Sequence, residues 1–520
     1  MTSPEALAAE YADRIEPLDR AANTGWWNAN VDSSDAAQQA RIAADLALSD
    51  ALADTAAFAQ IRDARHTTGL APLVERQLVI LEQVHTPHQV DPSLRHHLVE
   101  LETEINARFA RHRGTIDGRT VDDNEIARIL RTSADSGERR AAWEAAKTVG
   151  SEVEADLRKL VRTRNAAARA LGYRDHFALT LAITDFDETR LFATIDQVDA
   201  LTAAPFRDLK SALDEQLAAR FDLAPDELRP WHYDDPFFQE APRAAGVDLD
   251  PYLHDADLSE LTTRSFDRLG LDVRAVMQRS DLLPRDGKNQ HAFCIDIDRA
   301  GDVRVLSNNT PGERWTETML HEFGHAVYFE GVDRDLPWVL RTMHHCLTEG
   351  VAMRCGRLVH DPAWLERVAG LTPATVADLA PRLRAARRAQ LLVFARWVLV
   401  MTYFERNLYA DPDGDHDTRW WDLVERFQLL RRPQGRRAPD WAAKIHIAVA
   451  PVYYHNYLFG EMVASALAAT FGDLVDGDGA GHALARRLFS PGATLRWDQL
   501  IAAATGAPLT PAVLARDLAG

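Results

Sequence analysis

Two histidines and a glutamate stand at a spacing that suits a metal site. His321 and His325 are four residues apart, and Glu322 directly follows the first histidine. On an α-helix, residues i and i+4 share one face, so both imidazoles can reach the same ion while Glu322 points toward a metal-bound water. The residues from Glu313 to Phe329 contain no proline and are compatible with a helix. The pattern therefore predicts a zinc site in the middle of a helix.

A third ligand is expected nearby, because a catalytic zinc ion normally takes three protein ligands and keeps one position for water. Glu349 is the candidate, since it follows His325 by 24 residues and lies beyond a turn rich in Asp, Gly and Pro. This is enough chain for a second helix to return antiparallel to the first. His344 and His345 are the alternative ligands. We expect one Zn²⁺ per chain.

The zinc motif and the place of Glu349 resemble those of the angiotensin-converting enzyme family of zinc peptidyl dipeptidases and, more distantly, of the thimet oligopeptidase family. Residues 26–31, Trp-Trp-Asn-Ala-Asn-Val, resemble a Trp-Asn segment of the first family, and residues 165–173 resemble its Ala-Arg-x-x-Gly-Tyr helix. The resemblance implies a bacterial-type, cytoplasmic member with a single catalytic domain over residues 1–520. The implied fold is a two-lobed helical ellipsoid around a deep central cleft.

A C-terminal segment carries the most informative resemblance. Lys-Ile-His-Ile from Lys444, followed by Pro-Val-Tyr-Tyr-His-Asn-Tyr ending at Tyr457, is similar to a substrate-binding segment of the family. The resemblance implies that Lys444 binds the C-terminal carboxylate of the substrate, that His446 and Tyr457 bind the scissile carbonyl, and that Tyr454 also contacts the substrate. The interval from His446 to Tyr457 is one residue longer than in the animal enzymes, so Tyr453 is an alternative to Tyr454.

Two further stretches resemble substrate-binding parts of the family. The residues from His291 to Asp296 are similar to a His-Ala-Ser-Ala-Trp-Asp strand, which pairs with an extended peptide as an added strand. His291 and Ala292 are therefore candidates for substrate binding. Phe-Phe-Gln at residues 237–239 resembles a segment whose glutamine joins the lysine at the C-terminal carboxylate, which makes Gln239 a candidate as well.

Two positions depart from the family pattern. The family carries an aspartate four residues after the third ligand, where it orients a zinc histidine, and this chain has Met353 there. The group that orients the histidine must therefore differ. Asn456 stands where the chloride-dependent animal enzymes carry an arginine beside the catalytic tyrosine, which puts anion activation in doubt.

The resemblance implies hydrolysis of short peptides, with release of C-terminal dipeptides by Glu322-assisted attack of zinc-bound water. The nearest alternatives are an endo-oligopeptidase of the thimet type and a metallocarboxypeptidase. An alternative from another class is a peptide-binding homologue that has lost activity, for which Met353 is the support.

The pattern of apolar residues indicates which elements carry these groups. From Pro4 to about Leu223 they recur at three- and four-residue intervals, which predicts an almost wholly helical half. Helices are expected again from Glu313 to Leu518. Between the two, prolines interrupt the helical pattern, and alternating residues at 291–297 and 302–306 predict a hairpin, the only sheet expected. The predicted fold is mostly all-α with this small antiparallel sheet near the zinc site.

Composition narrows the possible partners. The net charge of −19 disfavours binding to nucleic acid or to an anionic membrane. Three cysteines cannot form a disulfide framework and fit a reducing compartment. The first residues lack the features of a signal peptide, and the most apolar stretch, residues 391–404, is too short to span a bilayer. We expect a cytoplasmic monomer or homodimer that acts on short peptides, with no nucleic-acid or membrane partner.

Overall fold

The computed structural model describes residues 3–32, 34–242, 247–289, 291–472, 474–475 and 478–519. Most of these residues lie in helices, as the sequence predicted. The helices of the N-terminal half are α1 (Pro4–Val31), α2 (Asp35–Leu52), α3 (Thr55–Arg65), α4 (Pro72–His85), α5 (Pro92–Arg111), α6 (Asp123–Thr132), α7 (Ser136–Ala170), α8 (His176–Ile183) and α9 (Glu188–Phe221).

The C-terminal half begins with short helices in the proline-containing region and continues with longer ones. These helices are α10 (Asp250–Leu253), α11 (Leu258–Asp267), α12 (Arg274–Arg279), α13 (Glu313–Glu330), α14 (His345–Gly356), α15 (Pro362–Arg367), α16 (Pro373–Ala410), α17 (His416–Gln428), α18 (His446–Val449), α19 (Tyr454–Phe471), α20 (Asp478–Leu484), α21 (Trp497–Thr505) and α22 (Leu514–Ala519).

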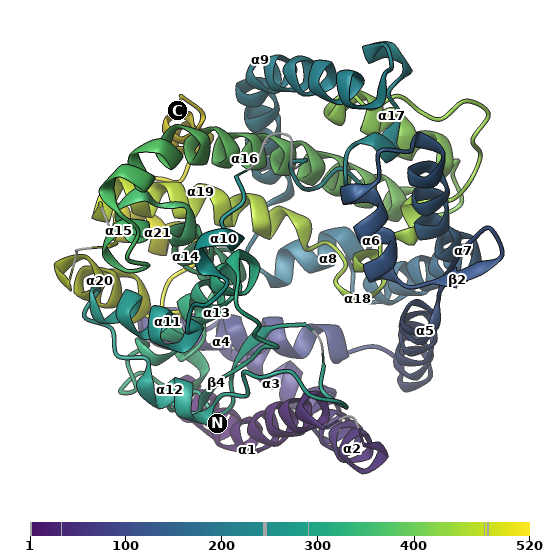
Figure 1. Ribbon diagram of the computed structural model, residues 1–520. Helices are drawn as coiled ribbons and strands as arrows, with labels where there is room; N and C mark the ends of the chain where they lie inside the picture. Colours follow the sequence, from purple (N-terminus) through teal and green to yellow (C-terminus); the bar gives the residue numbers. More distant parts are fainter. Residues whose placement is uncertain are drawn as a thin grey trace.

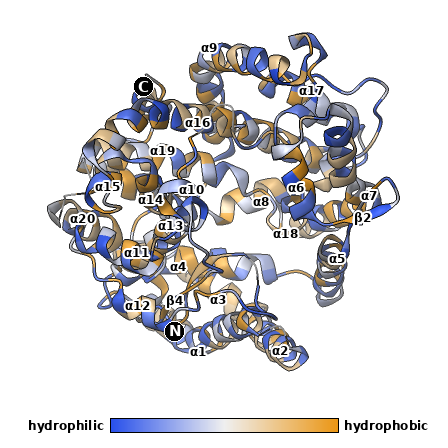
Figure 2. Ribbon diagram, viewed as in Figure 1, coloured by the Kyte–Doolittle hydropathy of each residue, from blue (hydrophilic) through white to orange (hydrophobic). Residues whose placement is uncertain are grey.

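The helices form two groups. In Figure 1, α11 to α15 and α19 to α21 lie on the left, whereas α5, α6, α7 and α17 lie on the right. The long helix α16 runs along the top and packs against α15, α17 and α19. In Figure 2, hydrophobic residues, in orange, are common on the helix segments that face other helices. The two lobes, the deep central cleft and the single domain over residues 1–520 stay predictions.

Short polar side chains fix where several helices begin. Asp122, Asp135, Asp175 and Asp187 each precede a helix and accept a hydrogen bond from the backbone N–H three residues further on. Such N-caps satisfy backbone donors that the first turn leaves unpaired.

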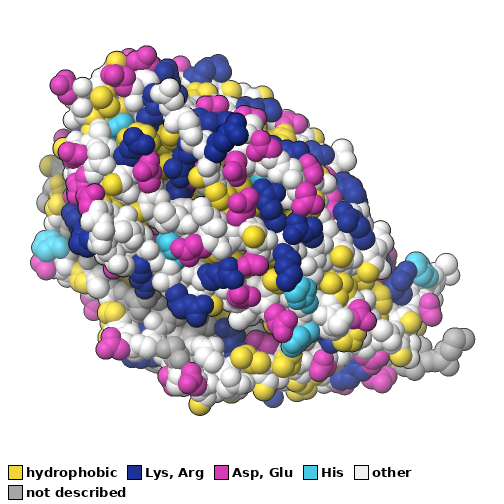
Figure 3. Space-filling model, turned by 90° about the vertical axis from the view of Figure 1, so that its right-hand side faces the viewer, with side chains coloured by type: hydrophobic (Ala, Val, Ile, Leu, Met, Phe, Trp, Pro, Cys, Tyr) yellow, Lys and Arg dark blue, Asp and Glu magenta, His cyan; other side chains and the backbone are white. Residues whose placement is uncertain are grey.

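On the face seen in Figure 3, basic and acidic side chains are interspersed.

The predicted hairpin is confirmed as β3 (Phe293–Asp296) and β4 (Val303–Leu306), which pair antiparallel with Phe293 opposite Leu306. The expectation of a single sheet was wrong, because β1 (Gly114–Ile116) pairs with β2 (Arg119–Val121). The turn between these strands, Asp117-Gly118, has φ values of 49° and 77°. Two left-handed residues suit a tight hairpin, so this pair reverses a strand and does not merely separate two helices.

The most apolar stretch of the chain is the buried middle of α16. Its one charged residue before Phe404, Arg396, is buried and pairs with Asp199 of α9. Within the described residues, none of the helices combines the length and the apolar character that crossing a bilayer requires.

Glycines allow α13, α14 and α19 to approach one another closely. A Cβ atom on Gly324 of α13 would lie 2.8 Å from the Cα atom of Ala352 in α14. A Cβ atom on Gly350 of α14 would lie 2.3 Å from a methyl carbon of Val463 in α19. Gly460 of α19 also lies next to Gly350, because a Cβ atom on Gly460 would lie 3.4 Å from the backbone nitrogen of Gly350. These three helices therefore form one tightly packed layer.

Candidate metal centre and active site

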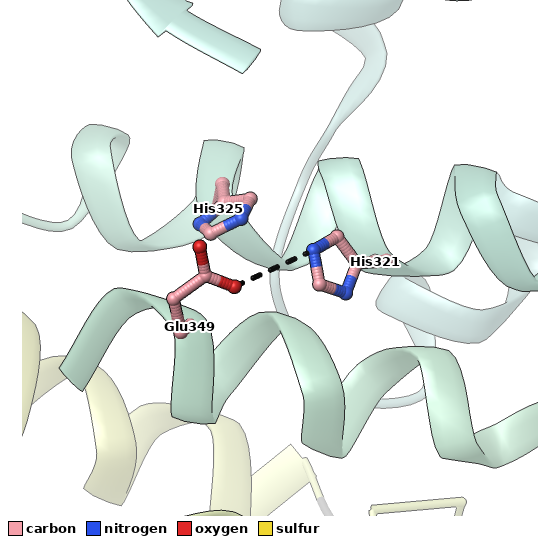
Figure 4. Close-up of side chains that lie close together, drawn as sticks. All are labelled: His321, His325 and Glu349. Atoms are coloured by element: carbon pink, nitrogen blue, oxygen red, sulfur yellow. Dashed lines mark ion pairs between the residues drawn. The ribbon is translucent and has the colours of Figure 1, made fainter. Parts of the chain in front are cut away.

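The predicted zinc ligands lie together between two helices. His321 and His325 project from α13 and Glu349 from α14, as Figure 4 shows. Their ligand atoms all lie within 4.8 Å of one another, and His321 Nε2 is 3.8 Å from Glu349 Oε2. Two imidazoles and one carboxylate form a donor set that fits catalytic zinc and leaves a position for water.

The alternative ligands are not part of this group. His344 donates through Nε2 to the carbonyl of Leu495 at 2.9 Å, away from the other ligands. His345 is exposed, and its ring lies 5.7 Å from the ring of Tyr453. Glu349 is therefore the acidic residue that the structure brings to the histidine pair.

Burial and mutual repulsion act on the two carboxylates of the centre. Desolvation and the nearby charge of Glu349 together raise the pKa of Glu322 to about 8, while the nearby backbone N–H of Cys294 opposes the shift. Desolvation also raises the pKa of Glu349 to about 7, while the hydroxyl of Tyr453 donates to it at 3.1 Å and opposes the shift. A divalent cation at this place would reverse this balance and favour the ionised carboxylates.

The two histidines are held neutral by their surroundings. Desolvation lowers the pKa of His321 to about 4 and that of His325 well below its ordinary value, with His321 adding to the effect on His325. Neutral imidazole is the form that binds metal ions. Both rings are thus ready to act as ligands at neutral pH.

A threonine orients the second histidine. Nδ1 of His325 lies 2.6 Å from Oγ1 of Thr348, the buried residue directly before Glu349. When Nε2 of His325 binds a metal, Nδ1 carries the proton, so it donates to Thr348. Met353 lies elsewhere, with its sulfur 3.0 Å from the position of a Cβ atom on Gly460. The hydroxyl of Thr348, one residue before Glu349, thus takes the place of the aspartate that the family pattern has at Met353.

The three neighbouring tyrosines take different places. Tyr453 donates to Glu349 and so contacts the third ligand itself. The ring of Tyr454 lies 5.0 Å from that of His446, and Lys444 Nζ lies 5.7 Å from the Tyr454 centroid. The ring of Tyr457 lies 5.2 Å from Tyr453 and 5.6 Å from Tyr454. Tyr454, and not Tyr453, is therefore the tyrosine that accompanies Lys444 and His446.

Lys444 and Gln239 meet although 205 residues separate them. Nζ of Lys444 donates to Oε1 of Gln239 at 2.7 Å, and it lies 5.0 Å from the ring centroid of Phe237 and 5.3 Å from that of Trp397. Desolvation lowers the pKa of Lys444 to about 8, against the nearby charge of Asp235. The pair forms a buried polar site with aromatic walls.

The strand β3 lies beside the zinc helix. The strand packs against α13, so it borders the metal centre, and the backbone N–H of Cys294 in β3 lies near enough to Glu322 to lower its pKa. His291 and Ala292 directly precede this strand, the first exposed and the second half-buried. Desolvation, together with the charges of Lys444 and His291, lowers the pKa of His446 to about 4.

Comparison with known families finds a match in the N-terminal part of the chain. Residues 3–219, less than half of the chain, match the model of the angiotensin-converting enzyme family, so this segment is similar to that family. A comparison with curated proteins finds no match. The segment that matches the angiotensin-converting enzyme family covers α1 to α9 and ends before α13, so the roles of the metal-centre residues depend on their geometry.

Two contacts of the candidate metal centre were missed by sequence reasoning. The first is Thr348 on His325, for which the only available signal was the absence of the family aspartate at Met353. The second is the hydrogen bond from Tyr453 to Glu349, for which the ambiguous tyrosine register was the signal. In both cases the residue type was visible in the sequence, but its partner was not.

Proposed function

We propose that the chain is a peptidyl dipeptidase, which releases dipeptides from the free C-terminus of short peptides. The hydrogen-bonded pair of Lys444, which is buried, and Gln239, which is half-buried, carries this proposal. Lys444 offers a positive charge, and the amide nitrogen of Gln239 can donate to the second carboxylate oxygen. Charge-assisted hydrogen bonds of this kind are strong where the aromatic walls keep water away.

Tyrosine rings link this pair to the metal ligands. The ring of Tyr454 lies 5.7 Å from Lys444 Nζ, and the ring of Tyr457 lies 5.6 Å from that of Tyr454. The charge of Glu349 acts on Tyr457, so Tyr457 lies near the third metal ligand. A carboxylate held by Lys444 would therefore place the end of the peptide near the metal centre, and the number of residues between the two is what the product analysis measures.

The residues around the metal would divide the chemistry among them. When bound, zinc lowers the pKa of a coordinated water toward about 7 and polarises a carbonyl group. Glu322 accepts the proton of the attacking water and passes it to the leaving amine. Tyr457 and His446 donate hydrogen bonds to the carbonyl oxygen as it gains negative charge, and each well-placed donor contributes roughly 3 to 4 kcal/mol. His291 and Ala292 hold the extended peptide as an added strand.

The proposal is tested by incubating the purified protein with a mixed set of short peptides, each as the free acid and as the C-terminal amide, with and without a zinc chelator. Mass spectrometry identifies the products. We expect dipeptides from the free acids alone, and we expect the chelator to stop their release. In the variant Lys444→Ala, KM should rise for the free acids, and any residual cleavage of amides should be unaffected.

Other products would indicate the alternatives. Internal cuts in both acids and amides would identify an endo-oligopeptidase, and release of single C-terminal residues would identify a carboxypeptidase. Absence of cleavage with zinc bound would identify a peptide-binding protein without activity. Each of these results contradicts the dipeptidase proposal.

A further inference from the structure

Val452, in the turn between α18 and α19, has a strained backbone. Its φ is +55°, in the left-handed region, and its side chain is 3% exposed. A β-branched residue rarely adopts this conformation, because its Cβ atom crowds the backbone. Such a residue persists only where its surroundings hold it, and strained residues cluster at functional sites.

A buried carboxylate holds this turn. Oε1 of Glu405, on α16, accepts a hydrogen bond from the backbone N–H of Val452 at 2.8 Å. Glu405 is 1% exposed, and desolvation raises the pKa of its carboxyl group to about 8, against the hydrogen bond from Val452. The carboxyl group of Glu405, which is costly to bury, is thus placed where it binds the backbone N–H of Val452.

An arginine holds the backbone of α18, which precedes this turn. Arg164, on α7, donates through Nη1 to the carbonyl of Ile447 at 2.9 Å and through Nη2 to that of Ala448 at 2.5 Å. Nη1 also donates to the hydroxyl of Tyr409, on α16, at 3.2 Å. The backbone that follows His446 is therefore held at Ile447 and Ala448, a few residues before the strained turn.

Tyr453 directly follows the strained residue and contacts the third metal ligand. Its hydroxyl donates to Oε1 of Glu349 at 3.1 Å, and its ring packs 5.2 Å from that of Tyr457. A change of φ at Val452 would swing Tyr453 away from Glu349. It would also change how the first turn of α19, which carries Tyr457, meets the metal centre.

We propose that Glu405 is a positioning residue: by holding Val452 in its left-handed conformation, its carboxylate aligns Tyr453 with Glu349 and Tyr457 with the substrate. Glu405 touches neither metal nor substrate and acts through the turn. The part that concerns Tyr457 rests on the proposed peptidase function, whereas the part that concerns Glu349 does not.

The test uses four variants of the full chain. Glu405→Gln keeps an oxygen acceptor of the same size, Glu405→Leu removes the acceptor, Val452→Gly allows a left-handed backbone without strain, and a double variant combines Glu405→Leu with Val452→Gly. We expect Glu405→Leu to lower kcat by about tenfold to a hundredfold, the range for a misplaced catalytic group, with little change in KM. Glu405→Gln should stay close to the parent, and the double variant should recover most of the kcat that Glu405→Leu loses.

A matched control separates positioning from folding. Asn165 is fully buried, and its Nδ2 donates to the carbonyl of Tyr409 on α16 at 2.8 Å. Asn165→Leu removes another side-chain contact to the backbone of the core, so it should lower the thermal stability without selectively lowering kcat. If Glu405→Leu itself does not fold, the double variant decides, because the proposal requires that it fold and be active.

A second measurement does not depend on activity. Zinc affinity, measured by competition with a chelator, should fall in Glu405→Leu by no more than it falls in Tyr453→Phe. A variant with both changes should bind zinc as Tyr453→Phe does, because the two act through one contact. Parental kcat and parental zinc affinity in Glu405→Leu would overturn the proposal, as would a double variant as slow as Glu405→Leu. A chain that binds zinc but cleaves no peptide would refute the proposed function and leave this zinc test standing.

Discussion

Replacing Thr348 by valine isolates the hydrogen bond that orients the second zinc histidine. Valine has nearly the shape of threonine, so the change leaves no cavity at this buried position and removes only the oxygen. In the parent, Thr348 Oγ1 lies 2.6 Å from His325 Nδ1. In the variant, the N–H at Nδ1 of the metal-binding tautomer would have no partner there.

Two independent magnitudes agree on the size of the effect. Leaving a buried donor without a partner costs about 1 to 3 kcal/mol. Removing the outer partner of a metal-binding histidine typically lowers metal affinity by about 10- to 100-fold, which corresponds to about 1.4 to 2.8 kcal/mol. Because desolvation already holds the pKa of His325 well below its ordinary value, protonation of the free imidazole adds nothing at neutral pH. We therefore expect the zinc dissociation constant to rise by about 10- to 100-fold.

Chelator competition at fixed pH measures this constant for the parent and for Thr348→Val. The control is Thr262→Val, since Thr262 is 1% exposed and its Oγ1 donates to the carbonyl of Leu258 in α11, away from the metal centre. The control should bind zinc as the parent does. Equal zinc affinity in Thr348→Val and in the parent would refute the orienting role of the hydroxyl.

Four further predictions follow from the geometry. The pKa of Lys444 is about 8, so KM for free-acid peptides should rise as the pH is raised through about 8 and Lys444 loses its charge; a KM that stays flat across this range would contradict its role. Tyr457→Phe should lower kcat by about 100- to 1,000-fold and leave zinc bound, as steady-state kinetics and metal analysis would measure. Glu349 is protonated below its pKa of about 7 in the metal-free protein, so zinc affinity should increase as the pH rises through 7, with proton release that calorimetry in two buffers detects. Gly324→Ala should lower the free energy of unfolding by about 1 to 3 kcal/mol and weaken zinc binding, because its methyl group would meet Ala352 at 2.8 Å; unchanged urea unfolding would contradict this.

The metal ligands could be predicted because helix geometry places them. A spacing of four residues puts His321 and His325 on one face whatever surrounds the helix. Glu349 follows from the length of chain needed to return, and the structure brings it within reach of both histidines. Helices over the N-terminal half follow in the same way from the apolar period, which depends on local residues alone.

The contacts that support the ligands could not be predicted, because they depend on how elements are rotated and packed. Thr348 reaches His325 only because α14 presents the face next to Glu349, and no spacing rule contains that rotation. The choice between Tyr453 and Tyr454 depends on the strained φ of Val452, which a sequence does not reveal for a β-branched residue. The pair of β1 and β2 was not predicted, because each strand has only three residues, too few for an alternating pattern to stand out.

The close contact of α13, α14 and α19 would couple zinc binding to peptide binding, although the residues proposed for the two lie far apart in the sequence. Two of these helices carry the predicted zinc ligands, while the third begins with the tyrosines proposed to meet the peptide, and the glycines let each helix lie directly against the next. If a peptide binds as proposed, a small shift of α19 would reach Glu349 through this contact. By thermodynamic reciprocity, the factor by which the peptide tightens zinc binding would then equal the factor by which zinc tightens peptide binding. On the proposed function, substrate would help to retain the ion, and zinc would be lost most readily when there is nothing to cleave.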